Sequence, residues 1–413
     1  MEKARQYVFF VCCLGISSGM LLIDFIRILP SISMVVLVLL GISYLLKPIA
    51  LEGRQNSKPF YSLALTFAIL LPSILYSENH SYLFERWQIA LPYLLLPIAF
   101  IKIPKLSTRR HFLLYESYFF FILLISLIAF VYYLFNQQLI NQLYLESRVM
   151  PTIVSHHPTL SLMIVFAIYV SYWLYQSKRY YKLPLEKNIF LLGGTFLFIF
   201  IHVFSVRSGL LALYVIILVE LGRWIFQKKQ YKKALISGAI LILVGTATLF
   251  LSPTVSNKIA NTTQDLNNYQ NEGSANNQSL GSRIISYKNA IQIAQNTSLL
   301  WGCGLGDLED LNLEIFKTQY PEISKPIIPH NQFLYYLAAI GILGVIMFTL
   351  FFYFPLFYQK AFLDPLLLIH VIIISIGFQF EAPMETQIGV AYTLIFILLP
   401  IHQKFGARAK KLS

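Results

Sequence analysis

Charged residues are scarce in this sequence. They make up 12% of the 413 residues, about half of the share found in soluble globular domains. Hydrophobic residues make up 57%, and the mean hydropathy is +0.63. This composition excludes an ordinary soluble domain and predicts an all-α, polytopic integral membrane protein.

Cysteine and acidic residues are also few. Cys12 and Cys13 are adjacent inside the first expected helix and Cys303 is far from both, so no disulfide framework or cysteine metal site can be built from them. Nineteen acidic residues face 32 basic ones, for a net charge of +13. We interpret this excess as attraction to anionic lipids of the inner leaflet, which makes a nucleic-acid partner unnecessary.

Twelve apolar runs approach or reach the length that spans a bilayer, about 17–25 residues. They are expected near residues 7–24, 29–46, 60–77, 88–103, 112–135, 158–176, 189–204, 209–226, 234–251, 333–358, 366–380 and 387–402. Prolines 92 and 97 predict a kink in the fourth run. The shortest runs, 189–204, 366–380 and 387–402, could be tilted or partly re-entrant.

The distribution of basic residues predicts the orientation. With the N-terminus inside, 23 of the 32 lysines and arginines face the cytoplasm, as the positive-inside rule requires. Both termini are then cytoplasmic. The segment Met1–Leu22 is basic and then apolar but lacks a small-residue cleavage site, so we expect it to be kept as the first helix.

The chain is expected to have three parts: nine membrane helices in 1–251, one large extracytoplasmic loop in 252–331, and three further helices with a cytoplasmic tail in 332–413. Within the loop, apolar residues at helical spacing predict a helix that begins at an N-cap, Ser282, with Arg283 at its start. The glycine turn 302–306 should lead the loop back onto the membrane helices. A second amphipathic stretch is expected at 308–317.

The loop ends at Pro329-His330-Asn331, where an apolar helix begins. A helix start has open N–H groups and partial positive charge, which suit an anionic ligand. Histidine exchanges a proton near neutral pH. We therefore expect any catalysis at His330, with Asn331 beside it.

A short outer turn holds Arg207, Ser208 and Gly209. A charge so close to the membrane favours a function over simple snorkelling.

Other polar residues at the outer rim permit more than one interpretation. Arg86 is a substrate contact or a snorkelling interface charge. His157 contacts substrate or belongs, with His156, to an interfacial rim; two adjacent histidines make a poor metal site. Glu381 and Glu385 orient a histidine or an arginine, or they cap the flanking helices.

Four of these pieces, in this order, resemble the O-antigen ligase/polymerase superfamily of bacterial envelope glycan assembly. They are Arg207-Ser208-Gly209, Gly281-Ser282-Arg283, the glycine turn at 302, 304 and 306, and Pro329-His330-Asn331 leading into a helix with Gly341 and Gly344. The histidine pair with Pro158 and the segment 381–387 are similar to features of some members. The resemblance covers 205–345 in detail and the whole chain in topology.

The resemblance implies transfer of a glycan from a polyprenyl-diphosphate carrier on the outer face of the bacterial inner membrane. The acceptor is a lipid-A core sugar in a ligase and a growing glycan in a polymerase, and no metal, nucleotide or other cofactor is implied. The catalytic residues would be Arg207, Arg283 and His330. The predicted substrate-binding residues are Asn331, Ser208, Arg86, His157 and Glu381. Guanidinium groups match phosphate geometry, and a histidine can take a proton from an acceptor hydroxyl.

The competing class is a transporter or flippase, which twelve spans fit equally well. The sequence shows no internal repeat of two halves and no paired interrupted helices, which are common in transporters. Ligase and polymerase share their chemistry. The last outer connection and the short loop favour a ligase, and a protein acceptor stays open.

Overall fold

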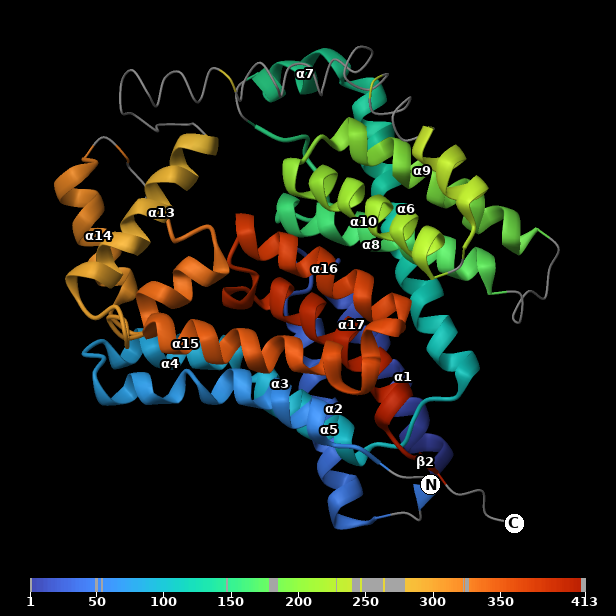
Figure 1. The fold of residues 1–413 in the computed structure, drawn as a ribbon, viewed down its shortest axis with the longest axis horizontal. Coiled ribbons are helices and arrows are strands. Elements are labelled where there is room, and N and C mark those ends of the chain that lie inside the picture. Colours follow the sequence, from blue (N-terminus) through green and yellow to red (C-terminus); the bar gives the residue numbers. More distant parts are fainter. Residues whose placement is uncertain are drawn as a thin grey trace. The chain divides into compact units, whose positions relative to one another are not determined.

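A computed structural model describes residues 2–48, 51–52, 55–145, 148–177, 185–227, 229–239, 279–321, 323 and 327–409, together with positions 246 and 263 (Figure 1). In these residues the fold is helical except for one antiparallel pair of two-residue strands, β1 (Leu51–Glu52) and β2 (Arg408–Ala409). The all-helical prediction is confirmed. The chain divides into two compact units.

The first unit comprises Met1–Tyr118, Arg283–Val371 and Phe378–Ser413. Its helices are α1 (Glu2–Gly19), α2 (Ile28–Leu46), α3 (Lys58–Ala68), η1 (Leu71–Leu75), α4 (His80–Ala90), α5 (Pro92–Lys102), α13 (Ser279–Asn296), α14 (Leu308–Gln319), α15 (Gln332–Phe357), η2 (Tyr358–Leu363), η3 (Pro383–Glu385) and α17 (Gln387–Phe405). Nearly every side chain of α17 is buried. The aromatic rings of Tyr118 and Phe396 pack 4.6 Å apart in this core.

The second unit comprises Phe119–Ser282 and Ile372–Gly377. It contains α7 (Gln137–Leu145), α8 (His157–Gln176), α9 (Glu186–Phe204) and α10 (Arg207–Phe226). Three helices, α6 (Thr108–Phe135), α16 (Pro365–Phe380) and α13, whose first four residues belong to the second unit, are divided between the units. In α8 and α9, Gly194 faces Ser171 so closely that a side chain at 194 would overlap its hydroxyl. Small residues of this kind let membrane helices approach.

Eight helices among the described residues are long and apolar enough to span a membrane, and α16 is apolar but only 16 residues long. This finding supports a polytopic membrane protein, whereas the predicted number of twelve spans is not confirmed. The run at 7–24 forms α1 without reaching the apolarity of a span. The run at 234–251 lies largely outside the described residues, and so does the first part of the large loop.

The run at 88–103 is not one helix. Pro92 separates α4, which ends at Ala90, from a second helix, α5, because a proline ring cannot continue the hydrogen-bond ladder of the preceding turn. Pro97 lies inside α5. The break is a single residue, Leu91, which keeps helical dihedral angles (φ −52°, ψ −34°).

The two expected loop helices are present as α13 and α14, but α13 begins at Ser279. Ser282 is therefore inside the helix, and its predicted role as N-cap is wrong. Arg283 is the fifth residue of the helix, one turn further in than expected. Helix boundaries depend on flanking residues that hydrophobic spacing does not report.

Helix α15 is interrupted at Gly341, which has φ +67° and ψ −175°. The glycine turn fills the interruption: Cys303 and Gly304 donate N–H bonds to the carbonyls of Ala338 and Ala339, at 2.9 Å each, and Ile342 donates to the carbonyl of Leu299 at 2.9 Å. The expected return of the loop onto the membrane helices is thus realised by backbone pairing. The sequence pattern had not indicated this interrupted helix.

Gly302 provides a test of this pairing. Its φ is +75°, and a Cβ there would lie 2.4 Å from the carbonyl carbon of Ala339. We expect Gly302→Ala to lower the free energy of unfolding by at least about 2 kcal/mol through strain and overlap, seen as a lower melting temperature in detergent.

The control is Gly222→Ala in α10, where no atom lies within 4 Å of the added Cβ. It should be neutral or stabilising by up to about 1 kcal/mol. Equal melting temperatures for the two variants would contradict the proposed constraint at Gly302.

Candidate active site

The start of α15 fixes the position of His330. Asn331 caps the helix, because its Oδ1 accepts N–H bonds from Phe333 (2.9 Å) and Leu334 (3.1 Å). The Asn331 amide nitrogen donates to the backbone carbonyl of Gln379 at 3.3 Å. Two of the N–H groups expected to be open to an anion are therefore satisfied internally, and substrate binding by Asn331 stays a prediction.

Helix α13 holds the backbone of His330 from the other side. The N–H of His330 donates to Ser286 Oγ at 3.3 Å, and the Tyr287 hydroxyl donates to its carbonyl at 3.2 Å. The same hydroxyl lies 2.7 Å from the carbonyl of Gln379. Burial raises the pKa of Tyr287, so the hydroxyl keeps its proton as a donor. Helix α13 thereby contacts the backbone of both His330 and Gln379.

Glu381 lies between His330 and Arg283. One carboxylate oxygen is 3.0 Å from His330 Nδ1, and the other is 3.6 Å from a terminal guanidinium nitrogen of Arg283. The three side chains are 17–28% exposed, so the cluster is sheltered but open to a ligand. Of the two roles expected for Glu381, orientation of a histidine and an arginine is the one observed.

This geometry determines what His330 can do. An ionised carboxylate only accepts hydrogen bonds, so the proton of a neutral imidazole lies on Nδ1 and the lone pair on Nε2. A base oriented by a carboxylate in this way recurs in enzymes that activate hydroxyl groups. Arg283 retains donors beyond its contact with Glu381, and guanidinium groups bind phosphate oxygens in pairs.

A second carboxylate, that of Glu385, is buried near the start of α15. Gln332 is fully buried; it donates to Glu385 Oε1 at 3.4 Å and accepts the N–H of Met384 at 2.9 Å. Arg86, from α4, donates to the backbone carbonyl of Glu385 at 3.5 Å and pairs with Glu85. Arg86 is thus part of a folded network that attaches the segment of Glu381 to the start of α15.

Burial raises the pKa of Glu385 from 4.5 to about 7. The positive charge of Arg86 and the hydrogen bond from Gln332 act in the opposite direction and limit this rise. The expected alternative, in which Glu381 or Glu385 caps the helix that follows, is not observed for α17. Thr386 caps that helix by accepting the N–H of Gly389.

Arg207, Ser208 and His157 lie in the second unit. Arg207 is the first residue of α10, and only Ser205 and Val206 separate that helix from α9, so the expected short turn is present. Ser205 has φ +50°, a costly conformation for a residue with a side chain. Ser208 Oγ lies 3.4 Å from Ser161 Oγ on α8, which begins at His157.

The structure brings together Arg283, His330, Asn331 and Glu381, with Arg86 behind them. Sequence reasoning missed Ser286 and Gln332, which hold His330 and the 381–385 segment in place. Gln332 follows the His-Asn pair directly, and a polar residue at a third successive position of an apolar helix was a usable signal. Within the described residues, no three histidine, cysteine or acidic side chains converge as metal ligands.

The raised pKa of Glu385 predicts a pH-dependent stability. Because the folded protein binds this proton more tightly than the unfolded chain, stability is lost as pH rises from 4.5 to about 7 and is constant above. At pH 8, Glu385→Gln should therefore have a free energy of unfolding higher than that of the native protein by on the order of 3 kcal/mol, seen as a higher melting temperature. Near pH 4.5 the two proteins should differ little.

The matched control is Glu309→Gln, on an exposed face of α14. Its melting curve should follow that of the native protein at every pH. If the Glu385→Gln curve did the same, the buried carboxylate would not be ionising at a cost in stability.

Comparison with known families agrees with the motifs. Residues 192–349 match a family model described as O-antigen ligase. No curated protein matches the chain. The matched span contains Arg207, Arg283 and His330, whereas Glu381 lies beyond it. Over residues 192–349, which are less than half of the chain, this protein is similar to the O-antigen ligase family.

Proposed function

We propose that this protein is an O-antigen ligase-like glycosyltransferase. It moves a glycan from a polyprenyl-diphosphate carrier to a lipid-A core sugar on the outer face of the bacterial inner membrane. The observation that carries the proposal is the cluster in which Glu381 contacts both His330 and Arg283.

The proposed reaction uses each member of this cluster once. His330 Nε2 accepts the proton of the acceptor hydroxyl as its oxygen bonds to the anomeric carbon of the glycan. The bond from that carbon to the carrier phosphate breaks, and the polyprenyl diphosphate leaves with the electron pair. Arg283 stabilises the negative charge that develops on the leaving group, while Glu381 keeps the histidine in the required tautomer.

Arg207 is proposed as a second guanidinium for the diphosphate. Two observations support this role. Only two residues separate α9 from α10, which restricts where the Arg207 side chain can reach, and Arg207 lies within the residues 192–349 that match the family model. Ser208, His157, Asn331 and Arg86 stay predicted substrate contacts. Two guanidinium groups would take the role that a metal ion has at many diphosphates, so we propose a metal-independent reaction.

The proposed orientation has both termini in the cytoplasm and the site facing the periplasm. It rests on the excess of lysine and arginine in the segments assigned to the cytoplasm. The carrier and lipid-A would reach the site from within the bilayer, while α13 and α14 provide the side facing water.

Three substitutions test the roles of the cluster. His330→Ala should lower the transfer rate about 10²–10⁴-fold through loss of the base, and Arg283→Ala about 10²–10³-fold through loss of charge stabilisation. Glu381→Gln keeps an acceptor for Nδ1 and should cost less. Rates are measured with purified protein, after melting temperatures show that each variant is folded.

Glu309→Gln, an exposed change on α14, is the control and should retain the native rate. A variant of Arg283 or His330 with full activity would remove that residue from the mechanism.

A gene deletion separates the acceptors. A ligase leaves long polymer on the carrier lipid and unmodified core lipopolysaccharide. Core that bears a single repeat unit identifies a polymerase of the same superfamily. Unchanged pools of both would contradict the polysaccharide role and favour a protein acceptor or a transporter.

A further inference from the structure

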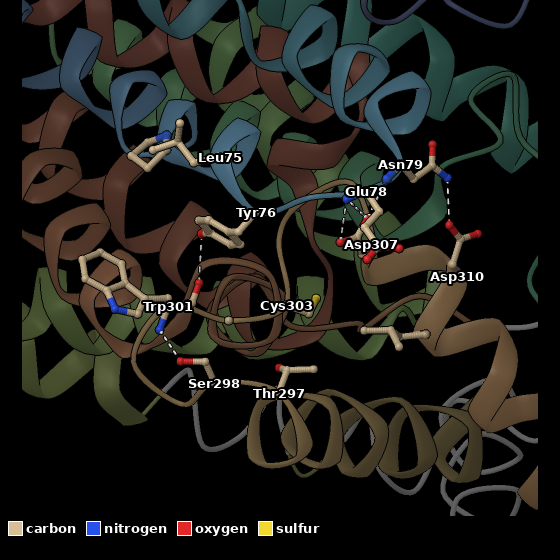
Figure 2. A pocket seen from close by; sticks show the side chains of 13 residues that line it. Leu75, Tyr76, Glu78, Asn79, Thr297, Ser298, Trp301, Cys303, Asp307 and Asp310 are labelled. Carbon is tan, nitrogen blue, oxygen red and sulfur yellow. Dashed lines mark hydrogen bonds between the residues drawn. The ribbon is translucent and has the colours of Figure 1, made fainter.

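A cavity of about 1270 Å³ lies in the first unit, and none of the residues of the proposed mechanism lines it. Figure 2 shows the side chains that do. One wall is the connection from η1 to α4, with Tyr76, Glu78 and Asn79. The other is the segment that follows α13, with Trp301, and the first turns of α14, with Asp310. None of these five side chains takes part in the proposed transfer.

The walls of the cavity are held together by hydrogen bonds (Figure 2). Asp307 accepts the backbone N–H groups of Glu78 and Asn79 at 2.8–3.0 Å, and the Tyr76 hydroxyl donates to the carbonyl of Trp301 at 3.0 Å. The hydrogen bonds from Cys303 and Gly304 to α15 also hold the segment that carries Trp301. The cavity is therefore formed before any ligand arrives, as is usual for binding sites.

Trp301 presents an aromatic surface at this cavity. The residue is 52% exposed, and no other ring of the described part of the chain packs against it. Its backbone carbonyl, and not its ring, makes the contact with Tyr76. A large flat ring with one polar edge, placed beside hydrogen-bonding groups, suits a ligand that has both an apolar face and hydroxyl groups.

The polar groups beside Trp301 are acceptors with negative charge. Glu78 and Asp310 are exposed carboxylates, and Asp310 accepts one hydrogen bond from the Asn79 amide at 2.8 Å. Carboxylates bind hydroxyl or amino donors strongly, and they repel phosphate and uronate groups. The carrier diphosphate is thus excluded here, in contrast to the cationic environment at Arg283.

We propose that this cavity is a saccharide subsite that binds neutral or amino sugars of one of the two glycan substrates. Trp301 stacks on the apolar face of a pyranose ring, and Glu78 and Asp310 accept its hydroxyl or amino donors. The inference rests on the proposed function. The turn contacts α15 at Ala339, seven residues or about 10 Å along the helix from Gln332, a distance that a short oligosaccharide spans.

The first experiment measures the KM of purified protein for donor and for acceptor separately. Trp301→Ala should raise the KM for one of them about 10-fold, with kcat little changed, and Trp301→Phe should restore most of the affinity. A change for the lipid-linked donor assigns the subsite to the donor glycan, and a change for the core acceptor assigns it to the acceptor. Asp310→Asn should raise the same KM by a smaller factor.

The control is Leu299→Ala, an apolar side chain that is 57% exposed nearby but does not line the cavity. If Trp301→Ala changed neither KM more than Leu299→Ala does, the subsite would be refuted and Trp301 would be only a membrane-interface anchor. The proposed function would survive that result.

A second experiment does not depend on transfer. Intrinsic fluorescence is titrated with core oligosaccharide and with repeat-unit glycan, each released by mild acid and free of lipid. Saturable binding by the native protein that weakens about 10-fold in Trp301→Ala supports the subsite even if no transfer is detected. Absence of binding to both glycans, or equal binding by the native protein and the variant, refutes it.

Discussion

The interruption of α15 at Gly341 is the constraint on which the first unit depends. A membrane-spanning helix that leaves its regular path exposes N–H and carbonyl groups, and these must find partners within the protein. The backbone at residues 299–304 supplies them. Because that segment joins α13 to α14, the pairing attaches both loop helices to α15 and brings the residues of α13 to the start of that helix.

The His330 cluster follows from this attachment. Ser286 and Tyr287 on α13 hold the backbone of His330, and Arg283 on the same helix reaches Glu381. Gln332 attaches the 381–385 segment to α15 from the buried side. A base, a cation and the carboxylate between them thus come from three segments that are distant in the sequence, and each is held by contacts other than those of its own side chain.

The sequence predicted the parts of this site better than their connections. Arg283, His330 and Glu381 were recognisable because charged and ionisable residues are rare in so apolar a chain. Their pairing was not, because it depends on contacts between residues almost 100 positions apart. The start of α13 was misplaced by three residues, since spacing reports which face of a helix is apolar and not where its first hydrogen bond forms.

The central claim is that a lipid diphosphate leaves as the glycan moves, with His330 as the base. The most direct measurement is mass spectrometry of both products made by purified protein from lipid-linked glycan and acceptor, with a metal chelator present. The account predicts one polyprenyl diphosphate for each glycan transferred, and almost none of either product with His330→Gln. Equal product formation by the native protein and that variant, or glycan transfer without release of the diphosphate, would contradict it.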